Sequence, residues 1–411
     1  MAIKRILMIG PVDFSIDNAP KVHFYNLAKE FSNLGANVLS IVYGPIDKNL
    51  SDSKINFKIL SLPNPLKGSH FLRFIKYFNF TLISLWQSFK FSPSIIYLRF
   101  SPPSFFYLLF LRLLKIFYNK FKIILELNSW ISEERKVLGE SEKKIKLVEF
   151  MQIKSAFLSD FLRVVSPGIK EKLIKYRINE RKIALIGNGT DINHFKPINK
   201  KEAKKTLGLD PHFLYVGFIG NFVIWQGLEY LLQTIPKILE TNKNVRFILV
   251  GDGILMPKIR KEVSRFKEEQ VALTGNVPYQ KANLYINAFD IGIAPFIKER
   301  NENIGLSPLK IRDYAACGVP IITTKIRGLE IVKEKKIGIL VPPNDAEALF
   351  KAIKKLVNSS RLRKEMGKRG RKLAEEIFSW EYVARQILNI NSNTPSKNSY
   401  EKRELCFQRS Y

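Results

Sequence analysis

The feature that most constrains the fold is an alternation of short apolar runs with helical patterns, which occurs twice along the 411 residues. In the first half the strand-like runs include RILMIG, NVLSIVYG, SIIYLRF and FKIILELN, and apolar residues repeat at helical spacing between them. The second half repeats this order with FLYVGFIG, VRFILVGDG, VALTGNV, DIGIAPF and VPIITT. Strands that alternate with helices form parallel sheets with helices on both faces. The sequence therefore predicts an α/β protein with two doubly wound, Rossmann-like domains.

The boundary between the two halves is the segment HFKPINKKEAKKTLGLDP, which is polar, basic and bounded by prolines. We expect an N-terminal domain over residues 1–196, a linker over 197–210 and a C-terminal domain over 211–376. A final helix over 377–390 is expected to pack back on the N-terminal domain, and the polar segment 391–411 is expected to be disordered. Two such domains enclose a central cleft between the carboxyl ends of their strands.

The charge of the chain calls for an anionic partner or a compositional origin, because the formal net charge is +30. Abundant Lys, Asn, Ile, Phe and Tyr indicate biased codon usage, but such bias does not remove acidic residues. Between Asp52 and Glu126 there is no Asp or Glu, whereas eleven lysines and arginines occur there among many aromatics. This pattern favours either nucleic acid or an anionic membrane surface as partner.

Two segments bear on the membrane hypothesis. The run from Pro102 to Tyr118 is interrupted by Arg112 and Lys115 and falls short of the ~20 apolar residues that a span needs. We favour a helix buried on a sheet over direct insertion. Residues 66–90 are a separate hypothesis for interfacial contact, in which aromatics enter the interface and cations meet lipid phosphates. These residues are Phe71, Phe74, Phe78 and Trp86, and Lys67, Arg73, Lys76 and Lys90.

The cellular compartment is indicated by the cysteines and by the start of the chain. Cys317 and Cys406 lie far apart in unlike surroundings, so we expect no disulfide and a reducing, cytoplasmic environment. The apolar run near the start is too short for a signal-peptide core and reads as a first strand.

Three loops of the second half follow strands, where doubly wound sheets bind ligands. The loop GNFVIWQG, residues 220–227, separates a strand from a helix, and a helix N-terminus attracts anions, yet the loop contains no Lys or Arg. The segment VGDG, residues 250–253, ends the next strand. In LTGNVPYQ a proline turn directs the backbone from Val277 to Tyr279 towards the cleft, where it can meet a planar base.

A fourth segment, NIGLSPLKIRDYAACGVPIIT, supplies the cation that the first loop lacks. Ser307 and Pro308 open a helix, and Lys310 follows in its first turn. Asp313 lies three residues on, so Lys310 and Asp313 share a helix face. Taken alone, the pair reads as a surface ion pair. Its place at the cleft edge, after a glycine-containing loop, favours a binding role.

These segments, together with NGTDINHFKP, GILVPPNDAEAL and FSWEYVA, resemble in order and spacing the motif series of family 4 glycosyltransferases, which have the GT-B fold. The resemblance covers most of residues 188–383, and NAPKVHF and ILELNSW extend it more weakly into the first half. It implies a nucleotide-sugar donor in the C-terminal domain, an acceptor mainly on the N-terminal domain, retention of anomeric configuration, and no cofactor or obligatory metal. The sequence agrees on metal, since it has no Asp-x-Asp and its four histidines are scattered.

The resemblance also assigns the donor site, with two departures. The family usually has Arg and Lys in the loop that here contains Asn221 and Gln226, and usually Glu where this chain has Asp313. We predict that Lys310 and the backbone N–H groups from Ser307 to Leu309 take over stabilisation of the diphosphate, and that Asp313 holds the ribose hydroxyls. The alternative is a decayed, inactive site. The expected donor-binding residues are Gly220, Asn221, Gln226, Gly251, Asp252, Val277, Tyr279, Ser307, Leu309 and Asp313.

In the first half, Asn128 falls where much of the family has a histidine that contacts the sugar. Glu126 shares a strand face with Asn128, so both are expected in the cleft and are catalytic candidates with Lys310. The alternative for Glu126 is a solvated strand end. Asn18, just before the first helix, and His23, in its first turns, are expected to contact the acceptor. The alternative for His23 is a surface histidine.

The resemblance thus implies a retaining glycosyltransferase, and we expect it to act in cell-surface polysaccharide or glycolipid synthesis. We expect a glycan or lipid-linked acceptor, a peripheral location on the inner face of the plasma membrane, and no nucleic acid. One alternative is a GT-B enzyme of another kind, such as a nucleotide-sugar epimerase, which should show carboxylates and histidines in the cleft. The other is a non-catalytic, basic nucleic-acid- or membrane-binding protein with a decayed GT-B site, which explains the charge and leaves the motifs unexplained.

Overall fold

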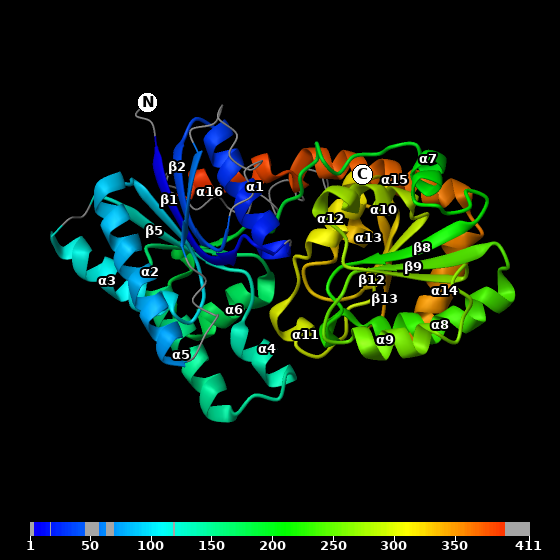
Figure 1. The fold of residues 1–411 in the computed structure, drawn as a ribbon, viewed down its shortest axis with the longest axis horizontal. Coiled ribbons are helices and arrows are strands. Elements are labelled where there is room, and N and C mark those ends of the chain that lie inside the picture. Colours follow the sequence, from blue (N-terminus) through cyan, green and yellow to red (C-terminus); the bar gives the residue numbers. More distant parts are fainter. Residues whose placement is uncertain (1–3, 17, 46–56, 63–69, 118–119, 391–411) are drawn as a thin grey trace, which may run out of the picture.

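The computed structural model describes residues 4–16, 18–45, 57–62, 70–117 and 120–390, and it contains two parallel sheets side by side (Figure 1). The first sheet has the strand order β3-β2-β1-β4-β5-β6-β7 and the second has the order β10-β9-β8-β11-β12-β13. Every neighbouring pair of strands is parallel. The predicted pair of doubly wound domains is confirmed.

The N-terminal sheet is buried between two helical layers. Its strands are β1 (Arg5–Asp13), β2 (Asn37–Tyr43), β3 (Phe57–Leu62), β4 (Ile95–Arg99), β5 (Lys122–Leu127), β6 (Phe161–Val164) and β7 (Ile183–Leu185). Its helices are α1 (Ala19–Asn33), α2 (His70–Phe91), α3 (Ser104–Phe117), α4 (Ile131–Val137), α5 (Glu142–Leu158) and α6 (Pro167–Lys175). Because side chains alternate along a strand, Leu7 and Ile9 join the core under α2, α3 and α5, whereas Ile6 and Met8 join the core under α1.

The C-terminal domain repeats this layering. Its strands are β8 (Leu214–Ile219), β9 (Val245–Val250), β10 (Val271–Gly275), β11 (Ile291–Ala294), β12 (Ile321–Thr324) and β13 (Gly338–Val341). Its helices are α7 (Lys200–Thr206), α8 (Leu228–Thr241), α9 (Met256–Val263), α10 (Tyr279–Ala288), α11 (Asn301–Ile304), α12 (Leu309–Ala316), α13 (Ile331–Glu334), α14 (Ala346–Val357) and α15 (Ser360–Leu373).

The final helix, α16 (Trp380–Asn389), crosses back to the N-terminal domain and packs beside α1 (Figure 1). Val383, Ala384 and Ile387 are buried in the same cluster as the strand residues Ile6 and Met8. The C-terminal end of the described chain thus completes the core of the first domain.

The expected linker contains a helix that packs on the C-terminal domain. Asn199 caps α7 by accepting hydrogen bonds from the backbone N–H groups of Lys201 and Glu202. The buried Lys204 ammonium donates to the Asp290 carboxylate over 2.8 Å. A buried ion pair fixes this helix in place, which the polar composition of the segment did not indicate.

Helix α3 differs from the helix buried on a sheet that we favoured. Tyr107, Leu108 and Leu111 face the sheet, but the opposite side of the helix is apolar and open to solvent. No helix within the described ranges is long and apolar enough to cross a membrane.

Candidate functional site

The first two strands of the C-terminal domain, β8 and β9, are each followed by a glycine, and the two glycines are in contact. Gly220 follows β8 with φ +141° and Gly251 follows β9 with φ +136°, values that favour glycine. A Cβ atom at Gly251 would lie 1.9 Å from the Gly220 carbonyl oxygen, and one at Gly220 would lie 2.8 Å from the Lys310 Nζ atom. The absence of side chains here allows the Lys310 ammonium to lie against bare backbone at the strand ends.

Lys310 reaches into the loop that has no cation of its own. Its Nζ atom donates a hydrogen bond of 2.7 Å to Oε1 of Gln226 and lies 3.6 Å from the centre of the Phe218 ring. The residue is only 9% exposed. Burial lowers the pKa of this ammonium well below its usual range, while the nearby Asp313 carboxylate opposes that shift. Gln226 therefore acts as an acceptor that holds the Lys310 side chain.

Asp313 lies on the same helix as Lys310, α12, as predicted. Its side chain is bound by a residue of the segment that leads out of the N-terminal domain. Its Oδ1 atom accepts a hydrogen bond of 2.6 Å from the Thr190 hydroxyl. Burial raises the pKa of Asp313 to about 7, against the lowering effects of Thr190 and Arg312.

The remaining expected donor residues divide into two groups. Asn221 and Asp252 are exposed at the ends of β8 and β9. Ser307 is buried, and its hydroxyl and carbonyl oxygens both accept from Asn188 over 2.9 Å. The Tyr279 ring is stacked on His194, with ring centres 4.6 Å apart.

Val277 and Leu309 are half-buried, and they pack against different cores. Val277 packs against the C-terminal core that includes Phe195, and Leu309 packs against the core under α1. The residues at the start of α12 thus lie at the contact between the two domains.

In the N-terminal domain, Glu126 is the centre of a buried network at the end of β5. The residue is 0% exposed, and its carboxylate accepts from Arg163 NH1 over 2.8 Å and from Arg99 NH1 over 3.3 Å. It also accepts from the Tyr97 hydroxyl and the Asn128 amide. Burial opposes ionisation of Glu126, but the hydrogen bond with His23 and the charges of Arg163 and Arg99 outweigh burial and hold the pKa of Glu126 well below the usual range. The alternative reading of Glu126 as a solvated strand end is wrong, because this carboxylate is fully buried and surrounded by donors, whereas its catalytic role stays a prediction.

His23 belongs to the same network and is not a surface histidine. It is 3% exposed, and its Nε2 atom lies 2.9 Å from Oε2 of Glu126. Its ring meets Trp380 of α16 edge to face, with centres 4.7 Å apart. Burial lowers the pKa of His23 to about 4, although the Glu126 carboxylate raises it. The imidazole is therefore neutral at neutral pH.

Asn18 precedes α1, the helix that carries His23, and Asn128 directly follows β5, the strand that carries Glu126. The Asn18 side chain caps α1 by accepting from the backbone N–H of Lys21 over 3.0 Å. The Asn128 amide donates to Glu126, so the two residues share a strand face as predicted. Asn128 is half-buried and is therefore more accessible to solvent than Glu126.

Arg163 is the functional candidate that the sequence analysis missed. It lies fully buried on β6 and donates through NH2 to the Gly187 carbonyl over 2.7 Å and to Oδ1 of Asn188 over 3.2 Å. Asn188 in turn binds Ser307, so a continuous hydrogen-bonded chain leads from Glu126 to the start of α12. The available signal was a single arginine inside the apolar run FLRVVS, on the strand that pairs with β5.

The carboxyl edges of the two sheets are in contact where a central cleft was predicted. The Ser166 hydroxyl, after β6, donates to the Ile304 carbonyl of α11. Arg300 pairs with Glu134, and Arg327 pairs with Glu171. Among the described residues, no group of three or more His, Cys, Asp or Glu side chains is placed to hold a metal ion, and metal independence remains a prediction.

Comparison with known families gives two matches that together cover most of both domains. The model of glycosyltransferase family 4 matches residues 21–194, and the model of group 1 glycosyl transferases matches residues 213–359. An uncharacterised glycosyltransferase of Methanocaldococcus jannaschii is 26% identical over 259 residues, which are 61% of this chain and 64% of the relative. The capsular polysaccharide biosynthesis glycosyltransferase CapM of Staphylococcus aureus is 25% identical over 271 residues, 63% of this chain and 68% of the relative.

A D-inositol 3-phosphate glycosyltransferase of Segniliparus rotundus is 28% identical over 221 residues, 52% of this chain and 47% of the relative. The match therefore spans less than two thirds of the first and the third of these relatives.

Solved structures show the same arrangement of two domains. Sucrose-phosphate synthase of Thermosynechococcus elongatus superposes with a TM-score of 0.74 at 20% identity, over 99% of this chain and 100% of that one. Anabaena HepE in complex with UDP and glucose superposes with a TM-score of 0.73 at 16% identity, over 95% and 99%. At these identities the likeness shows the fold alone.

Proposed function

Because the chain belongs to the family 4 glycosyltransferases with the GT-B fold, we propose that it transfers a sugar from a nucleotide-diphosphate donor to a glycan or lipid-linked acceptor. The transfer retains the anomeric configuration and uses no metal or cofactor. Relatives named for capsular polysaccharide biosynthesis and for a phosphatidylinositol monomannoside mannosyltransferase support an acceptor in cell-surface polysaccharide or glycolipid synthesis.

One observation carries the proposal: Lys310 is a buried ammonium whose described partners are neutral. It donates to Gln226 and lies on the Phe218 ring, and no ion pair joins it to a carboxylate among the described residues. A buried charge without a counter-ion costs several kcal/mol, which a bound anion offsets. The diphosphate of a nucleotide sugar is the anion that fits the strand-end glycines and the N-terminus of α12.

The chemistry follows from where charge develops. As the glycosidic bond to the diphosphate breaks, the leaving group gains negative charge beside the Lys310 ammonium and the free N–H groups of α12. These donors therefore stabilise the transition state more than the ground state. The acceptor hydroxyl attacks the anomeric carbon from the same face and passes its proton to the departing diphosphate oxygen, since Glu126 is fully buried against Arg163 and supplies no nucleophile. Lys310 and Gln226 thus form the matched pair that replaces the loop cations usual in the family.

Two further residues orient the donor. The Asn128 amide donates to Glu126, which leaves its carbonyl oxygen to accept from a sugar hydroxyl. Asp313, once ionised, accepts from the ribose hydroxyls. The contacts between the two domains, such as Arg300 with Glu134, separate to admit the donor and close again over it.

Calorimetric titration of UDP-, GDP-, ADP- and CMP-sugars tests this function, with wild type, Lys310→Met and the control Lys351→Met. Lys351 is exposed on α14, so its loss removes one charge and leaves the site intact. We expect one nucleotide class to bind wild type and the control, and turnover with that donor to fall roughly 10²–10³-fold in Lys310→Met. Full activity in the presence of EDTA is expected.

The same titration separates the rival functions. Donor binding that survives in Lys310→Met would move the diphosphate contact to another residue. Failure of every donor to bind wild type would support a decayed site in a basic, non-catalytic protein, and salt-sensitive binding to DNA would then identify nucleic acid as its partner. We place the working enzyme in the cytoplasm, on the inner face of the plasma membrane, where lipid-linked acceptors and nucleotide sugars meet.

A further inference from the structure

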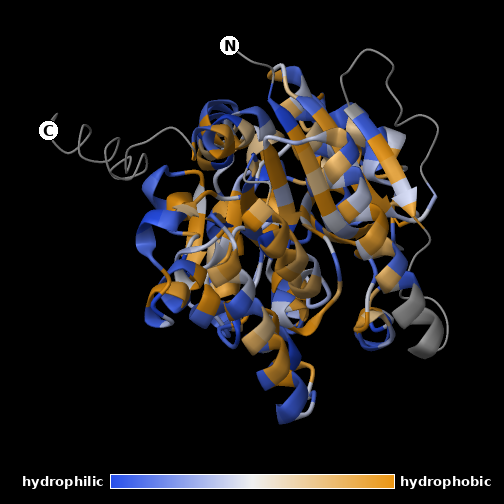
Figure 2. Ribbon diagram, turned by 90° about the vertical axis from the view of Figure 1, so that its left-hand side faces the viewer, coloured by the Kyte–Doolittle hydropathy of each residue, from blue (hydrophilic) through white to orange (hydrophobic). Residues whose placement is uncertain are grey.

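The outer layer of the N-terminal domain carries most of the large apolar side chains that are exposed among the described residues. Of the nineteen large apolar side chains that are exposed in the described part, thirteen lie on α2, α3 and α5. These helices cover one face of the first sheet, with α3 between the other two. Figure 2 looks onto this side of the molecule and shows apolar bands on its outer helices. From residue 211 onwards, Ile254 is the single described member of that set.

Helix α3 has two apolar stripes on opposite sides. One stripe, which includes Leu108 and Leu111, faces the sheet. The other faces solvent and ends in Ile116 and Phe117, which are 73% and 88% exposed. This second stripe follows helical spacing and consists of Phe106, Leu109, Phe110, Leu113, Ile116 and Phe117. A monomeric protein that exposes so continuous an apolar face has a partner for it.

Exposed aromatics on the neighbouring helices extend this surface, and lysines lie over them. The Lys90 ammonium is 5.0 Å from the Trp86 ring centre on α2. On α5, Lys154 lies 5.5 Å from the ring centre of Phe150. Lysines that run along apolar surface keep their charged ends at its edge, where the headgroups of a bilayer would be.

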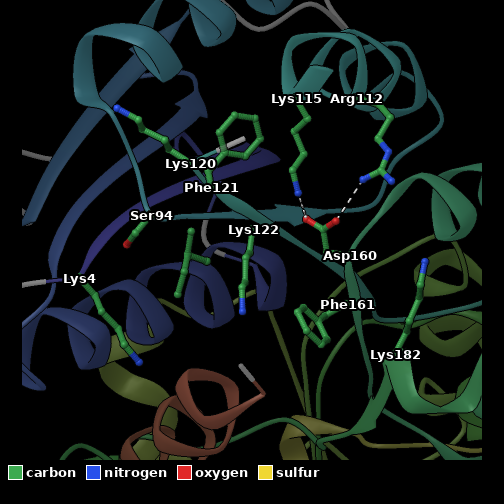
Figure 3. Close-up of a pocket in the computed structure, with 11 residues that line it drawn as sticks. Lys4, Ser94, Arg112, Lys115, Lys120, Phe121, Lys122, Asp160, Phe161 and Lys182 are labelled. Carbon is green, nitrogen blue, oxygen red and sulfur yellow. Dashed lines mark hydrogen bonds and ion pairs between the residues drawn. The ribbon is translucent and has the colours of Figure 1, made fainter. Parts of the chain in front are cut away.

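A basic hollow of about 750 Å³ adjoins the end of α3, at the amino edge of the first sheet (Figure 3). Six cationic side chains and one carboxylate line it: Lys4, Arg112, Lys115, Lys120, Lys122, Lys182 and Asp160. Arg112 and Lys115 both pair with Asp160, over 3.1 and 2.6 Å. Because Asp160 is the one carboxylate among six cations in the lining, the hollow keeps a large excess of positive charge. Such a concentration of charge attracts phosphate groups.

We propose that the outer face of α2, α3 and α5, with the basic hollow beside it, is a docking surface for an anionic lipid bilayer. The apolar stripe of α3 enters the interface, and the lysines of the hollow contact lipid phosphates. A second copy of this chain fits poorly, because it would bring the same basic rim against this one at a net charge of +30 per chain. Two cations on α3 itself, Arg112 and Lys115, belong to the hollow, so one helix joins both parts of the surface.

This surface revises the membrane hypothesis based on residues 66–90. Residues 66–69 lie outside the described ranges, as do the side chains of Phe71, Arg73 and Phe74. Phe78 and Trp86 are exposed on α2, as that hypothesis required. The larger contribution comes from α3, which the sequence analysis assigned to a buried position. The proposal locates the partner surface of the proposed enzyme, but it depends on lipid binding alone and not on sugar transfer.

Flotation of the full chain with lipid vesicles tests the proposal, using phosphatidylcholine alone and phosphatidylcholine with phosphatidylglycerol. One variant, Phe110→Ser with Leu113→Ser, removes apolar side chains from the exposed stripe. A second, Lys120→Gln with Lys122→Gln, removes two charges from the hollow. The control, Lys351→Gln with Lys355→Gln, removes two exposed charges from α14 of the other domain.

We expect wild type and control to float with anionic vesicles, and to float far less with phosphatidylcholine alone. Each lysine near a bilayer changes affinity about fivefold, so the second variant should lose about 25-fold. The serine variant should lose at least as much, with an unchanged melting temperature because both sites are exposed. The proposal would be overturned if wild type stayed in the dense bottom fraction with every lipid mixture, or if the variants floated like wild type. Self-association of wild type that the serine variant abolishes would also overturn it, since this face would then be a protein interface.

If the flotation result is negative while a nucleotide sugar still binds, the docking surface fails and the proposed transfer stands. If vesicles bind but no donor does, the surface stands and the transfer fails.

Discussion

The two domains share one fold but treat a buried charge at a strand end in opposite ways. In the N-terminal domain, the Glu126 carboxylate accepts hydrogen bonds from Arg163, Arg99, Tyr97 and Asn128. In the C-terminal domain, the Lys310 ammonium contacts Gln226 and an aromatic ring, both neutral, and the nearby Asp313 carboxylate acts on it without an ion-pair contact. The first charge is satisfied within the protein, and the second is not. This difference is the basis of the proposal that the Lys310 ammonium serves a ligand, because an uncompensated buried charge is more often kept at a functional site than in a purely structural one.

Removal of Arg163 should give the largest effect on stability. Arg163→Met leaves Glu126 as a buried charge without its main partner, which typically costs about 3–5 kcal/mol. Urea denaturation measures the loss, and Arg181→Met, an exposed change nearby, is the control. Adding Glu126→Gln to Arg163→Met should restore part of the stability, since the unpaired charge is then gone. Equal stability of Arg163→Met and wild type would show that the network is not structural.

Acid should destabilise the N-terminal domain through His23. The folded protein holds its pKa at about 4, below the usual 6.5, so the unfolded chain takes up a proton first as the pH falls. Stability is therefore full above about pH 6.5 and is lost as the pH falls towards 4, by about 3 kcal/mol. His23→Gln keeps a donor towards Glu126 and should flatten this loss, whereas the exposed His212→Gln should not. Parallel pH profiles of His23→Gln and wild type would contradict the assignment.

The lysine of the C-terminal domain should behave in the opposite way to Arg163. Lys310→Met removes a buried charge that has no carboxylate partner and keeps the apolar contact with Phe218, so the ligand-free protein should be stabilised by about 2 kcal/mol. Thermal unfolding without donor measures this gain, and Lys351→Met should show none. A destabilisation similar to that of Arg163→Met would make Lys310 a structural residue and would erase the contrast between the domains.

The fold and part of the site could be predicted from sequence because they depend on local patterns. Apolar runs and helix-start signals located the strands and helices along the chain. The two-residue period of a strand placed Glu126 and Asn128 on one face, where they form a hydrogen bond. The placement of Lys310 and Asp313 on one helix was predictable for the same reason, because the two residues are only three positions apart. The sequence analysis predicted only that Lys310 replaces the missing loop cations, and the structure places its Nζ atom 2.7 Å from Oε1 of Gln226.

What the sequence did not show depends on contacts between distant segments. Arg163 was not among the candidate residues, because its partner Glu126 lies 37 residues away and no local pattern links the two. His23 was expected to contact the acceptor or solvent, since nothing local indicated that Trp380 covers it. Helix α3 is apolar on both sides, a pattern that indicates full burial, and only the finished fold shows that one side has no neighbour.

The smallest expected effect comes from giving Lys310 the partner that Glu126 gives Arg163. Gln226→Glu keeps the geometry of the 2.7 Å contact and supplies a carboxylate in place of the neutral amide oxygen. The ligand-free protein should become more stable by up to about 1 kcal/mol, because the buried ammonium gains a counter-ion. Donor affinity should fall about tenfold, since the new carboxylate competes with the diphosphate for Lys310 and repels it. Calorimetry and thermal unfolding on one sample give both values, and Gln226→Met separates loss of the acceptor from gain of charge. If Gln226→Glu raised stability and left donor affinity unchanged, the anion would bind elsewhere, and the C-terminal charge would be as structural as the N-terminal one.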